Sequence, residues 1–494
     1  MNRSTDTFHT IVIGSGSGGL TVAVGLSKLG KRVALVEAND VGGDCTNVGC
    51  VPSKTLIHLV THPGELSPAE VLARVQEKRN HLRDEETAWV KGMDLTFLEG
   101  RARFLSSERL EVALTEGGTR ELSARNIVIA TGAKPAVIPI DGLPEARTLT
   151  NESLFELPDK PEHLAIIGSG VVGSEMAFAF RKLGSRVSMV SRSGRVLSAS
   201  EPEASAVVGE AMTEGGIGLY LDAEPDAYDE ATQTLYVQRG GERLALEGVD
   251  KVLLAVGRVP NTAGLGLETT GVSFGDEGIP TDAYGATNVK GIYAIGDVNP
   301  ASSYTHSANA QGRRLVRRLA FPYLPAWGKE PLYPNATFTD PEVAAIGPSL
   351  AELKRRYHPA LVKTVRADLA KTDKGYTEGL ERGFVLIHAV RLSGRILGAT
   401  IVAPRASEMI SLLTAALYHG LSLYKLSGLV FPYPVLSEGI KKAADAFVFE
   451  SLPKLPREMG GYLRYRWAGP PAPDETAERR PHRGERHPEP TKSN

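Results

Sequence analysis

Residues 10–37 read TIVIGSGSGGLTVAVGLSKLGKRVALVE and carry the strongest fold signal in the N-terminal part of the chain. Residues 10–13, of which 11–13 are apolar and β-branched, predict a short buried strand. A helix is expected to follow the glycine turn and to run to about Leu29, where Gly30 ends it. A second strand is expected over residues 31–36. Two strands that flank a helix, with a glycine turn after the first strand, predict a βαβ unit of the dinucleotide-binding type.

The glycine turn has the spacing that a bound dinucleotide requires. Gly14 allows the tight turn, Gly16 lets the backbone approach a pyrophosphate, and Gly19 allows close packing of helix on strand. The pyrophosphate is expected at the positive N-terminal end of the helix. Glu37, at the end of the second strand, can accept hydrogen bonds from ribose hydroxyls. These four residues predict a nucleotide site.

The same pattern occurs a second time, over residues 164–191. A strand is expected over residues 164–167, a helix over 174–183 with Gly184 at its end, and another strand over 187–190. The glycines of the turn are Gly168, Gly170 and Gly173. The second strand ends 23 positions after the first glycine in both units, at Glu37 and at Ser191. Two complete units at matching spacing predict two dinucleotide folds in one chain.

The second unit differs from the first at the end of its second strand. Ser191 stands where a carboxylate is expected, and Arg192 and Arg195 follow. A carboxylate would repel a 2′-phosphate, whereas a guanidinium can bind one. The sequence therefore favours NADPH over NADH at this unit. A role of both arginines as solvated surface charges, and the use of NADH, stay open.

Further apolar segments predict how the domains are arranged. Strand-to-turn segments at residues 126–132, 252–258 and 291–297 indicate that the second fold is inserted into the first. Beyond residue 332, two β-rich stretches (383–390 and 395–402) precede two helices (407–418 and 436–447). The expected class is α/β, with two Rossmann-like domains and a C-terminal α+β domain. The expected limits are 1–150 with 278–330, 151–277, 332–455, and a disordered tail at 469–494.

Length, composition and charge restrict the class of protein. The chain has 494 residues, which suggests about three domains. Its 56 Lys and Arg balance 58 Asp and Glu, so no nucleic-acid partner is expected. No apolar run approaches the roughly 18 residues that a membrane span needs. The N-terminal residues have no apolar signal-peptide core, so we expect a cytoplasmic protein with no membrane insertion.

The chain has only two cysteines, and Cys45 and Cys50 stand five positions apart. This number excludes a disulfide scaffold and a four-cysteine metal site. In a reducing cytosol, a close pair is expected to be redox-active or metal-binding. Metal binding would need further soft ligands, and His58 alone gives thin support, so no resident metal is predicted. Two unpaired buried thiols remain the plain alternative.

The stretch GGDCTNVGCVPSK at 42–54 resembles the redox motif of the flavoprotein disulfide reductases, which include dihydrolipoamide dehydrogenase, glutathione reductase and mercuric reductase. Other landmarks of that family occur in order over about residues 8 to 450. They are ATG at 130–132, GSGVVGSE at 168–175, AVGRVPN at 255–261, IYAIGDV at 292–298 and FTDPEVAAIG at 338–347.

The resemblance implies an electron relay. FAD would occupy the first fold and NAD(P)H the second, and hydride would pass from nicotinamide to FAD and reduce a Cys45–Cys50 disulfide. Cys50 would face the flavin as a thiolate, and Cys45 would exchange with a small-molecule acceptor. The resemblance also implies a homodimer in which the C-terminal domain completes the partner's active site.

The resemblance assigns cofactor roles residue by residue. Gly14, Gly16, Gly19 and Glu37 would hold the ADP half of FAD. Asp297 would bind the ribityl chain, and Lys54 and Glu175 would lie near the flavin edge. The remaining cofactor contacts would come from Thr131, Gly132, Gly168, Gly170, Gly173, Arg192, Gly257 and Ala308.

The chain departs from the family's disulfide reductases in the C-terminal domain. In those enzymes, a histidine oriented by a glutamate is the acid/base group for thiol exchange. The matching stretch here is FPYPVLSE at 431–438, which keeps Glu438 but has Tyr433 in place of the histidine. An imidazole titrates near about 6.5 and a phenol near about 10, so the tyrosine is a poor proton carrier at neutral pH.

The tyrosine at this position resembles the mercuric reductases. Those enzymes carry a C-terminal cysteine pair, which this chain lacks. The predicted function is an NAD(P)H oxidoreductase that acts on a disulfide or a soft-metal substrate through Cys45 and Cys50, with Tyr433 and Glu438 as further candidate catalytic residues. A diaphorase or quinone reductase with accessory cysteines is the alternative. A non-enzymatic component of a multienzyme assembly is a third reading.

Overall fold

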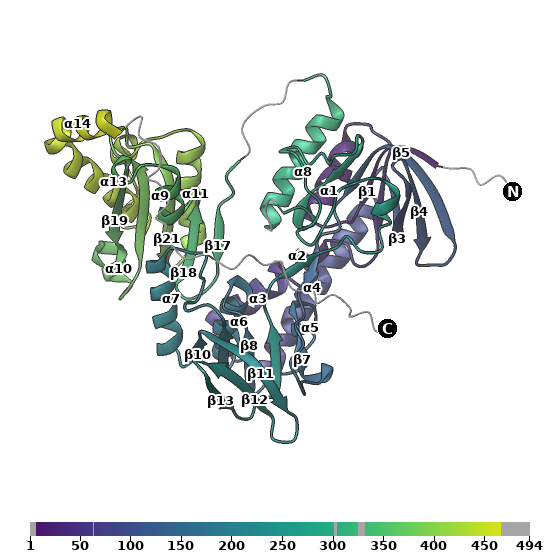
Figure 1. Cartoon of the computed structure of the whole chain (residues 1–494), viewed down its shortest axis with the longest axis horizontal. Helices are drawn as coiled ribbons and strands as arrows, with labels where there is room; N and C mark the ends of the chain where they lie inside the picture. The colour runs from purple at the N-terminus through teal and green to yellow at the C-terminus, as the bar shows by residue number, and fades with distance from the viewer. Residues whose placement is uncertain (1–5, 63, 301–303, 325–330, 466–494) are drawn as a thin grey trace, which may run out of the picture.

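The computed structural model describes residues 6–62, 64–300, 304–324 and 331–465. Each of its three main bodies is built around a sheet, and Figure 1 shows the first at the upper right, the second below and the third at the upper left. The predicted disordered tail, 469–494, lies outside the described residues. No helix of the described part is long and apolar enough to cross a membrane.

The first sheet joins distant parts of the sequence. β1 (Asp6–Ile13) pairs in parallel with β2 (Val33–Glu37) and β5 (Thr119–Ile129). β5 also pairs in parallel with β16 (Ile292–Ala294), so the chain returns to this sheet after the second sheet is complete. The prediction that the second fold is inserted into the first is therefore confirmed. β3 (Thr96–Ser106) and β4 (Arg109–Leu114) complete the sheet.

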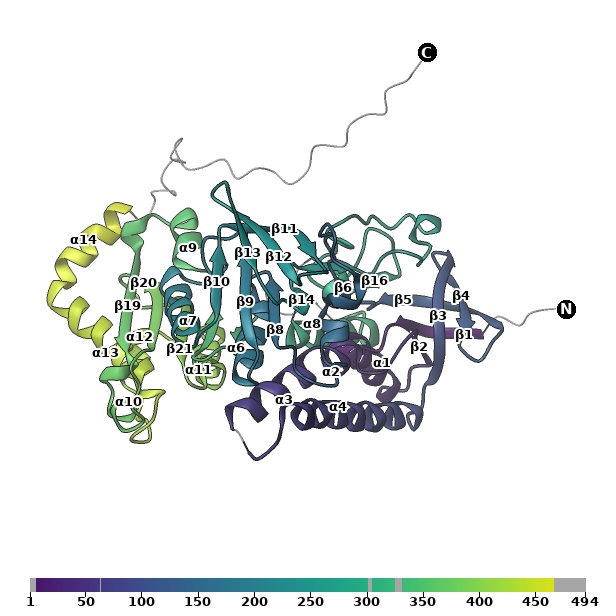
Figure 2. The ribbon, with the colours of Figure 1, turned by 90° about the horizontal axis from the view of Figure 1, so that it is seen from below.

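Helices cover this sheet and position the cysteine segment. α1 (Ser17–Lys28) packs against α8 (Thr305–Ala320), with Val22, Leu26 and Leu315 fully buried between them and the strands. The short α2 (Gly43–Asn47) and α3 (Cys50–Thr61) follow β2. The long α4 (Pro68–Lys91) starts at a capping box between Ser67 and Glu70 and lies along the same side as α3 in Figure 2.

The second sheet is entirely parallel, as a βαβ pattern predicts. Its order is β10–β9–β8–β14–β7, and α6 and α7 follow its strands. An antiparallel three-stranded sheet and a two-stranded ladder accompany it. The elements are β6 (Ala133–Pro135), β7 (Thr148–Leu149), α5 (Asn151–Leu154), β8 (His163–Ile167), α6 (Val171–Lys182), β9 (Arg186–Ser191), α7 (Pro202–Glu214), β10 (Gly218–Leu221), β11 (Ala223–Asp229), β12 (Thr234–Arg239), β13 (Glu242–Leu246), β14 (Lys251–Leu254) and β15 (Arg258–Pro260).

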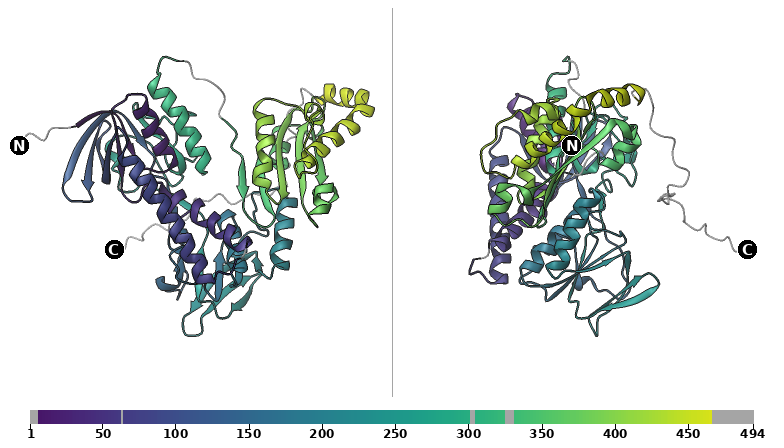
Figure 3. Two further views of the ribbon diagram at one scale, coloured as in Figure 1. Left: turned by 180° about the vertical axis from the view of Figure 1, so that it is seen from behind. Right: turned by 90° about the vertical axis from the view of Figure 1, so that its left-hand side faces the viewer.

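The third sheet is antiparallel, in the order β17–β18–β21–β20–β19, and it confirms the predicted C-terminal α+β fold. α11 and α13 cover it, and α14 lies at the outer edge of this body in Figure 3. The elements are β17 (Asn335–Thr337), β18 (Glu342–Ile346), α9 (Leu350–Arg356), β19 (Val362–Asp368), α10 (Asp373–Thr377), β20 (Phe384–Val390), β21 (Ile396–Ala403), α11 (Ala406–Tyr418), α12 (Leu423–Ser427), α13 (Glu438–Ser451) and α14 (Leu455–Tyr465).

Candidate active site

The turn between β1 and α1 leaves room for a ligand at only one of its glycines. Gly14 has φ +101°, and a Cβ there would lie 2.4 Å from the Ala130 carbonyl oxygen. A Cβ on Gly19 would lie 1.9 Å from the Gly14 oxygen. Gly16 is the N-cap of α1, and the nearest atom to its hypothetical Cβ is 4.0 Å away. Gly14 and Gly19 therefore serve the fold, while Gly16 faces open space at a helix N-terminus, which suits a phosphate.

Glu37 is held rigidly beside this turn. Its Oε2 accepts hydrogen bonds from the Ser15 amide at 2.6 Å and the Ser15 hydroxyl at 2.7 Å. Its Oε1 accepts one from the Asn39 amide at 2.8 Å. The carboxylate is thus fixed at the end of β2, next to Gly14 and Gly16, where a ribose would reach it.

A cavity of about 1520 Å³ extends from this turn to the cysteines. It is larger than the roughly 300–1,000 Å³ of pockets for drug-sized ligands and suits a dinucleotide. Most of the predicted FAD contacts line it, so the residues present fit the cofactor. Those lining residues are Gly14, Gly16, Glu37, Lys54, Thr131, Gly132, Glu175, Asp297 and Ala308. Gly19 and Gly257 do not line it.

The second glycine turn repeats the geometry of the first. A Cβ would lie 2.3 Å from the Ala255 oxygen at Gly168 and 2.1 Å from the Gly168 oxygen at Gly173. Gly170 is the N-cap of α6 and has no atom within 4 Å of a hypothetical Cβ. Gly257 follows β14 with φ +129°. This turn can therefore also accept a phosphate group at a helix N-terminus.

The two arginines after β9 differ in their surroundings. Arg195 donates hydrogen bonds to the carbonyls of Ser198 at 2.7 Å and Ser200 at 3.3 Å, so it stabilises the loop. Arg192 is exposed, and within the described residues no hydrogen bond or ion pair holds its guanidinium. The Ser191 hydroxyl bonds to the Ser169 hydroxyl at 2.8 Å. Arg192 is the arginine that remains available to a ligand.

Cys45 lies in the middle of the short helix α2, and Cys50 is the first residue of α3. Both are free thiols, and the Cys45 thiol donates a hydrogen bond to the Cys50 sulfur. Gly49 allows this approach, since a Cβ there would lie 2.7 Å from the Asp44 oxygen. The Thr305 hydroxyl lies 3.6 Å from the Cys50 sulfur.

The two thiols have opposite acidities. The hydrogen bond from Cys45, followed by the Thr305 hydroxyl and the positive charge of Lys54, lowers the pKa of Cys50 to about 6. Donating that bond, together with burial, raises the pKa of Cys45 well above its ordinary value. The contact between them therefore favours the thiolate on Cys50 and the protonated thiol on Cys45.

Lys54 connects the three bodies of the molecule. Its ammonium lies 2.7 Å from Glu175 Oε2 on α6 and 4.7 Å from the centre of the Phe338 ring. Glu175 is buried, and its other oxygen accepts a hydrogen bond from the Phe338 amide at 3.0 Å. The predicted Lys54–Glu175 pair is thus present in the structure.

Sequence reasoning missed Arg258 as a site residue. Its guanidinium contacts Asp44 and lies 3.4 Å from Asp297, so it crosses the cavity between the cysteine segment and the 296–298 turn. Burial raises the pKa of Asp297, and Arg258 opposes this shift. The AVGRVPN landmark contains Arg258 and was the available signal.

A second cavity, of about 570 Å³, opens at Cys45 between α1, α4 and α8. Cys45 lines both cavities, whereas Cys50 lines only the larger one. Sequence reasoning also missed this cavity, because its residues come from segments more than 200 positions apart. Its polar and aromatic lining includes Ser17, Thr21, Glu86, Trp89, Asn309 and Arg313.

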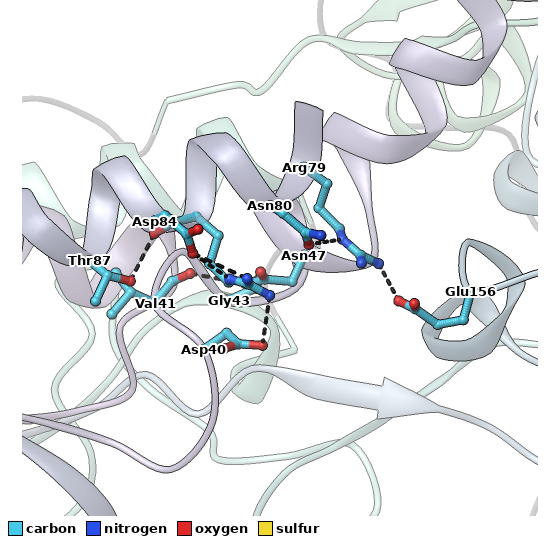
Figure 4. Close-up of polar contacts among 10 residues, drawn as sticks. Asp40, Val41, Gly43, Asn47, Arg79, Asn80, Asp84, Thr87 and Glu156 are labelled. Carbon is cyan, nitrogen blue, oxygen red and sulfur yellow. Dashed lines mark hydrogen bonds and ion pairs between the residues drawn. The ribbon is translucent and has the colours of Figure 1, made fainter. Parts of the chain in front are cut away.

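Helix α4 holds the cysteine segment in place. The Asn47 amide donates to the carbonyls of Val41 and Gly43, both at 2.9 Å, which closes the loop before α2 (Figure 4). Arg83 of α4 lies 4.0 Å from Asp40, and the buried Arg79 forms an ion pair with Glu156. One helix therefore anchors the cysteine loop and the start of the second body together.

Two family matches cover nearly all of the described chain. Residues 8–312 match the family described as pyridine nucleotide-disulphide oxidoreductase, and residues 333–444 match its dimerisation domain. The chain belongs to this family. As a pyridine nucleotide-disulphide oxidoreductase, it uses FAD and NAD(P)H, and it forms homodimers through the C-terminal domain.

Similar proteins within the family include enzymes of different substrate classes. A mercuric reductase of Acidithiobacillus ferrooxidans is 33% identical over 89% of this chain and 82% of its own length. Dihydrolipoyl dehydrogenase 3 of Pseudomonas aeruginosa is 31% identical over 89% of this chain and 97% of its own. The Cu(II) complex of the HOCl-induced flavoprotein disulfide reductase RclA from Escherichia coli has 26% identity and a TM-score of 0.82, covering 90% of this chain and all of that one.

The oxidoreductase's two C-terminal candidates do not join the cysteines within one protomer. Tyr433 is 72% exposed, and Tyr433 and Glu438 line neither cavity. A hydrogen bond to Asp373 raises the pKa of Tyr433, which makes it a still poorer proton carrier at neutral pH. Among the described residues, Glu438 Oε2 is buried without a hydrogen-bond partner. Its carboxylate thus has no imidazole to orient here.

Proposed function

We propose that this flavoenzyme reduces small-molecule disulfides with electrons from NADPH. The observation that carries the proposal is the position of Cys45 at the boundary of two cavities, while Cys50 faces only the cofactor cavity. A dithiol in that position relays two electrons from one cavity to the other. The Cys45 cavity, at about 570 Å³, has the size of a site for a small organic molecule.

The chain's own residues take distinct parts in this relay. Gly16 and Glu37 hold the adenosine half of FAD, and Asp297 binds its ribityl chain. Bound FAD supplies hydride acceptance from the nicotinamide and two-electron transfer to sulfur. Cys50 provides the low-pKa thiolate beside it, and Lys54 stabilises that charge. Cys45 attacks the acceptor.

A soft-metal ion is the second candidate substrate. Mercuric reductases are among the similar proteins, and Tyr433 stands where an acid/base histidine is expected. A metal ion held by two thiolates needs no proton carrier, whereas a disulfide does. The described residues contain no group of three or more His, Cys, Asp and Glu side chains arranged to hold a metal, so the binding of such an ion would depend on Cys45 and Cys50.

The donor preference follows from Arg192. Its guanidinium follows β9 and has no hydrogen-bond or ion-pair partner among the described residues, which supports binding of a 2′-phosphate and NADPH as the proposed donor. The domain limits at 1–150 with 278–330, 151–277 and 332–455 stay predictions, as does a cytoplasmic location.

An anaerobic reduction followed by a panel of acceptors tests the proposal. We expect NADPH to give a higher kcat/KM than NADH, and glutathione disulfide or lipoamide to be turned over faster than Hg(II), Cu(II) or a quinone. The double variant C45A/C50A is expected to lose disulfide turnover and to keep flavin-dependent quinone reduction. Intact disulfide reduction by the double variant would overturn the proposal.

A further inference from the structure

We propose that Glu86 is the acid–base group of the Cys45 cavity and moves the proton during disulfide exchange. This inference rests on the proposed disulfide reduction and deepens it. It assigns to α4 of the same protomer the task for which Tyr433 is chemically unsuited. Glu86 and Arg313 are the only charged side chains among the described residues that line the cavity, and no histidine lines it.

The structure brings Glu86 close to residues on both sides of Cys45, Gly42 and Thr46. Its Oε2 accepts a hydrogen bond from the Thr46 hydroxyl at 3.0 Å, and Thr46 is the residue after Cys45. A Cβ on Gly42 would lie 2.3 Å from the same oxygen. The Glu86 carboxylate is therefore held against the segment that carries Cys45. Glu86 also lines the cavity that Cys45 lines.

The charged groups around Glu86 leave it without a neutralising partner. Within the described residues, no ion pair involves its carboxylate. On α4, Arg83 pairs with Asp84 and Asp40, and Lys91 pairs with Glu99. On α2, Asp44 pairs with Arg258.

Among the described residues, the other charged or titratable groups that line the cavity are Cys45 on α2 and Arg313 on α8. Arg313 donates a hydrogen bond to Asn309 at 2.9 Å. Burial raises the pKa of Glu86, although the hydrogen bond from Thr46 opposes that shift. A carboxyl group whose pKa lies above its ordinary value is a better match for proton exchange near neutral pH.

In the proposed step, Glu86 moves one proton while Cys45 exchanges with the acceptor disulfide. The Glu86 carboxylate takes the proton of the Cys45 thiol, and the Cys45 sulfur attacks one sulfur of the acceptor disulfide. A Cys45–acceptor sulfur bond forms, the acceptor S–S bond breaks, and the leaving thiolate takes the proton from Glu86. The Cys50 thiolate then attacks the Cys45 sulfur, which forms the Cys45–Cys50 disulfide and releases the second thiolate. The acceptor gains the two electrons that the dithiol loses.

Two probes on the FAD-loaded C50S variant, which isolates Cys45, test this role. Exchange with bis(2-hydroxyethyl) disulfide expels an alkyl thiolate that needs a proton, whereas alkylation by iodoacetamide expels iodide, which does not. We expect Glu86→Gln to slow the exchange at pH 7 by about 100-fold. We expect alkylation to slow much less, because it needs Glu86 only to take the thiol proton and not to protonate a leaving thiolate. Mass spectrometry follows both adducts.

The chain offers a matched control at the adjacent position. Glu85 is exposed and pairs with His81 on its own helix, so Glu85→Gln should leave both rates unchanged. Gln at 86 keeps an oxygen that can accept the Thr46 hydrogen bond, so the loop is preserved. Equal slowing of exchange and alkylation, or no slowing of either, would overturn the inference. Neither probe needs NADPH or a turnover substrate, so this result is independent of the acceptor panel.

Discussion

At the residue scale, the charge around Cys50 sets the pH at which its thiolate forms. The pKa of Cys50 is lowered to about 6, so the thiolate forms as pH rises through that value. Lys54 contributes to this shift, and its loss would also leave the buried Glu175 charge unpaired. The loss of the Lys54 charge and the unpaired Glu175 charge both disfavour the Cys50 thiolate, so both raise the pKa of Cys50.

We therefore expect Lys54→Met to raise the midpoint of Cys50 ionisation by about one pH unit. The measurement is a pH titration of the long-wavelength absorbance of the NADPH-reduced holoenzyme, which reports the thiolate beside the flavin. Lys160→Met is the control, because Lys160 pairs with the exposed Glu162 on the second body. If the midpoint did not shift in Lys54→Met, the Lys54 charge would not contribute to the low pKa of Cys50.

At the element scale, one glycine of each turn is needed for ligand binding and other glycines of the same turn are needed for the fold. Ala fits the backbone at Gly16, where φ is −68°, and its methyl would point into open space. Ala at Gly19 would place its methyl 1.9 Å from a carbonyl oxygen. We expect Gly16→Ala to fold but to lose most bound FAD, and Gly19→Ala to lose the fold.

Flavin absorbance per chain after gel filtration, together with a thermal melt followed by circular dichroism, checks this prediction. If Gly16→Ala kept full flavin content, the pyrophosphate would not lie at this turn. Gly170→Ala serves as the matched control, because it makes the same change at the other βαβ unit. We expect it to keep FAD.

The elements themselves were largely predictable from the sequence. The strand and helix positions of both βαβ units agree with the structure within a few residues, because glycine turns and apolar runs mark them locally. The predicted helix at 174–183 starts earlier, at Val171, since Gly170 is its N-cap. Glu86 was not predictable, because its role depends on a contact across 40 positions of the chain. Arg258 stands in the AVGRVPN landmark, but its contact with Asp44 spans 214 positions and does not follow from that motif.

At the scale of the whole molecule, Glu175 lies where three bodies meet. Lys54 comes from the first body, Glu175 from the second, and Phe338 directly follows β17 in the dimerisation domain. Glu175 is 3% exposed, so its charge depends on these partners rather than on water. The contact therefore couples the stability of the bodies as well as supporting the site.

We expect Glu175→Gln to lower the free energy of unfolding by about 3 kcal/mol, because it breaks a buried ion pair. This loss is at the low end of the usual range for breaking a buried ion pair. The reason is that the Lys54 side chain is 33% exposed, so water can solvate its charge. The matched control is Glu162→Gln, which breaks a pair whose carboxylate is 86% exposed and should cost less than about 1 kcal/mol. Urea denaturation followed by flavin release compares the two. Equal midpoints would show that the three bodies are held together without this carboxylate.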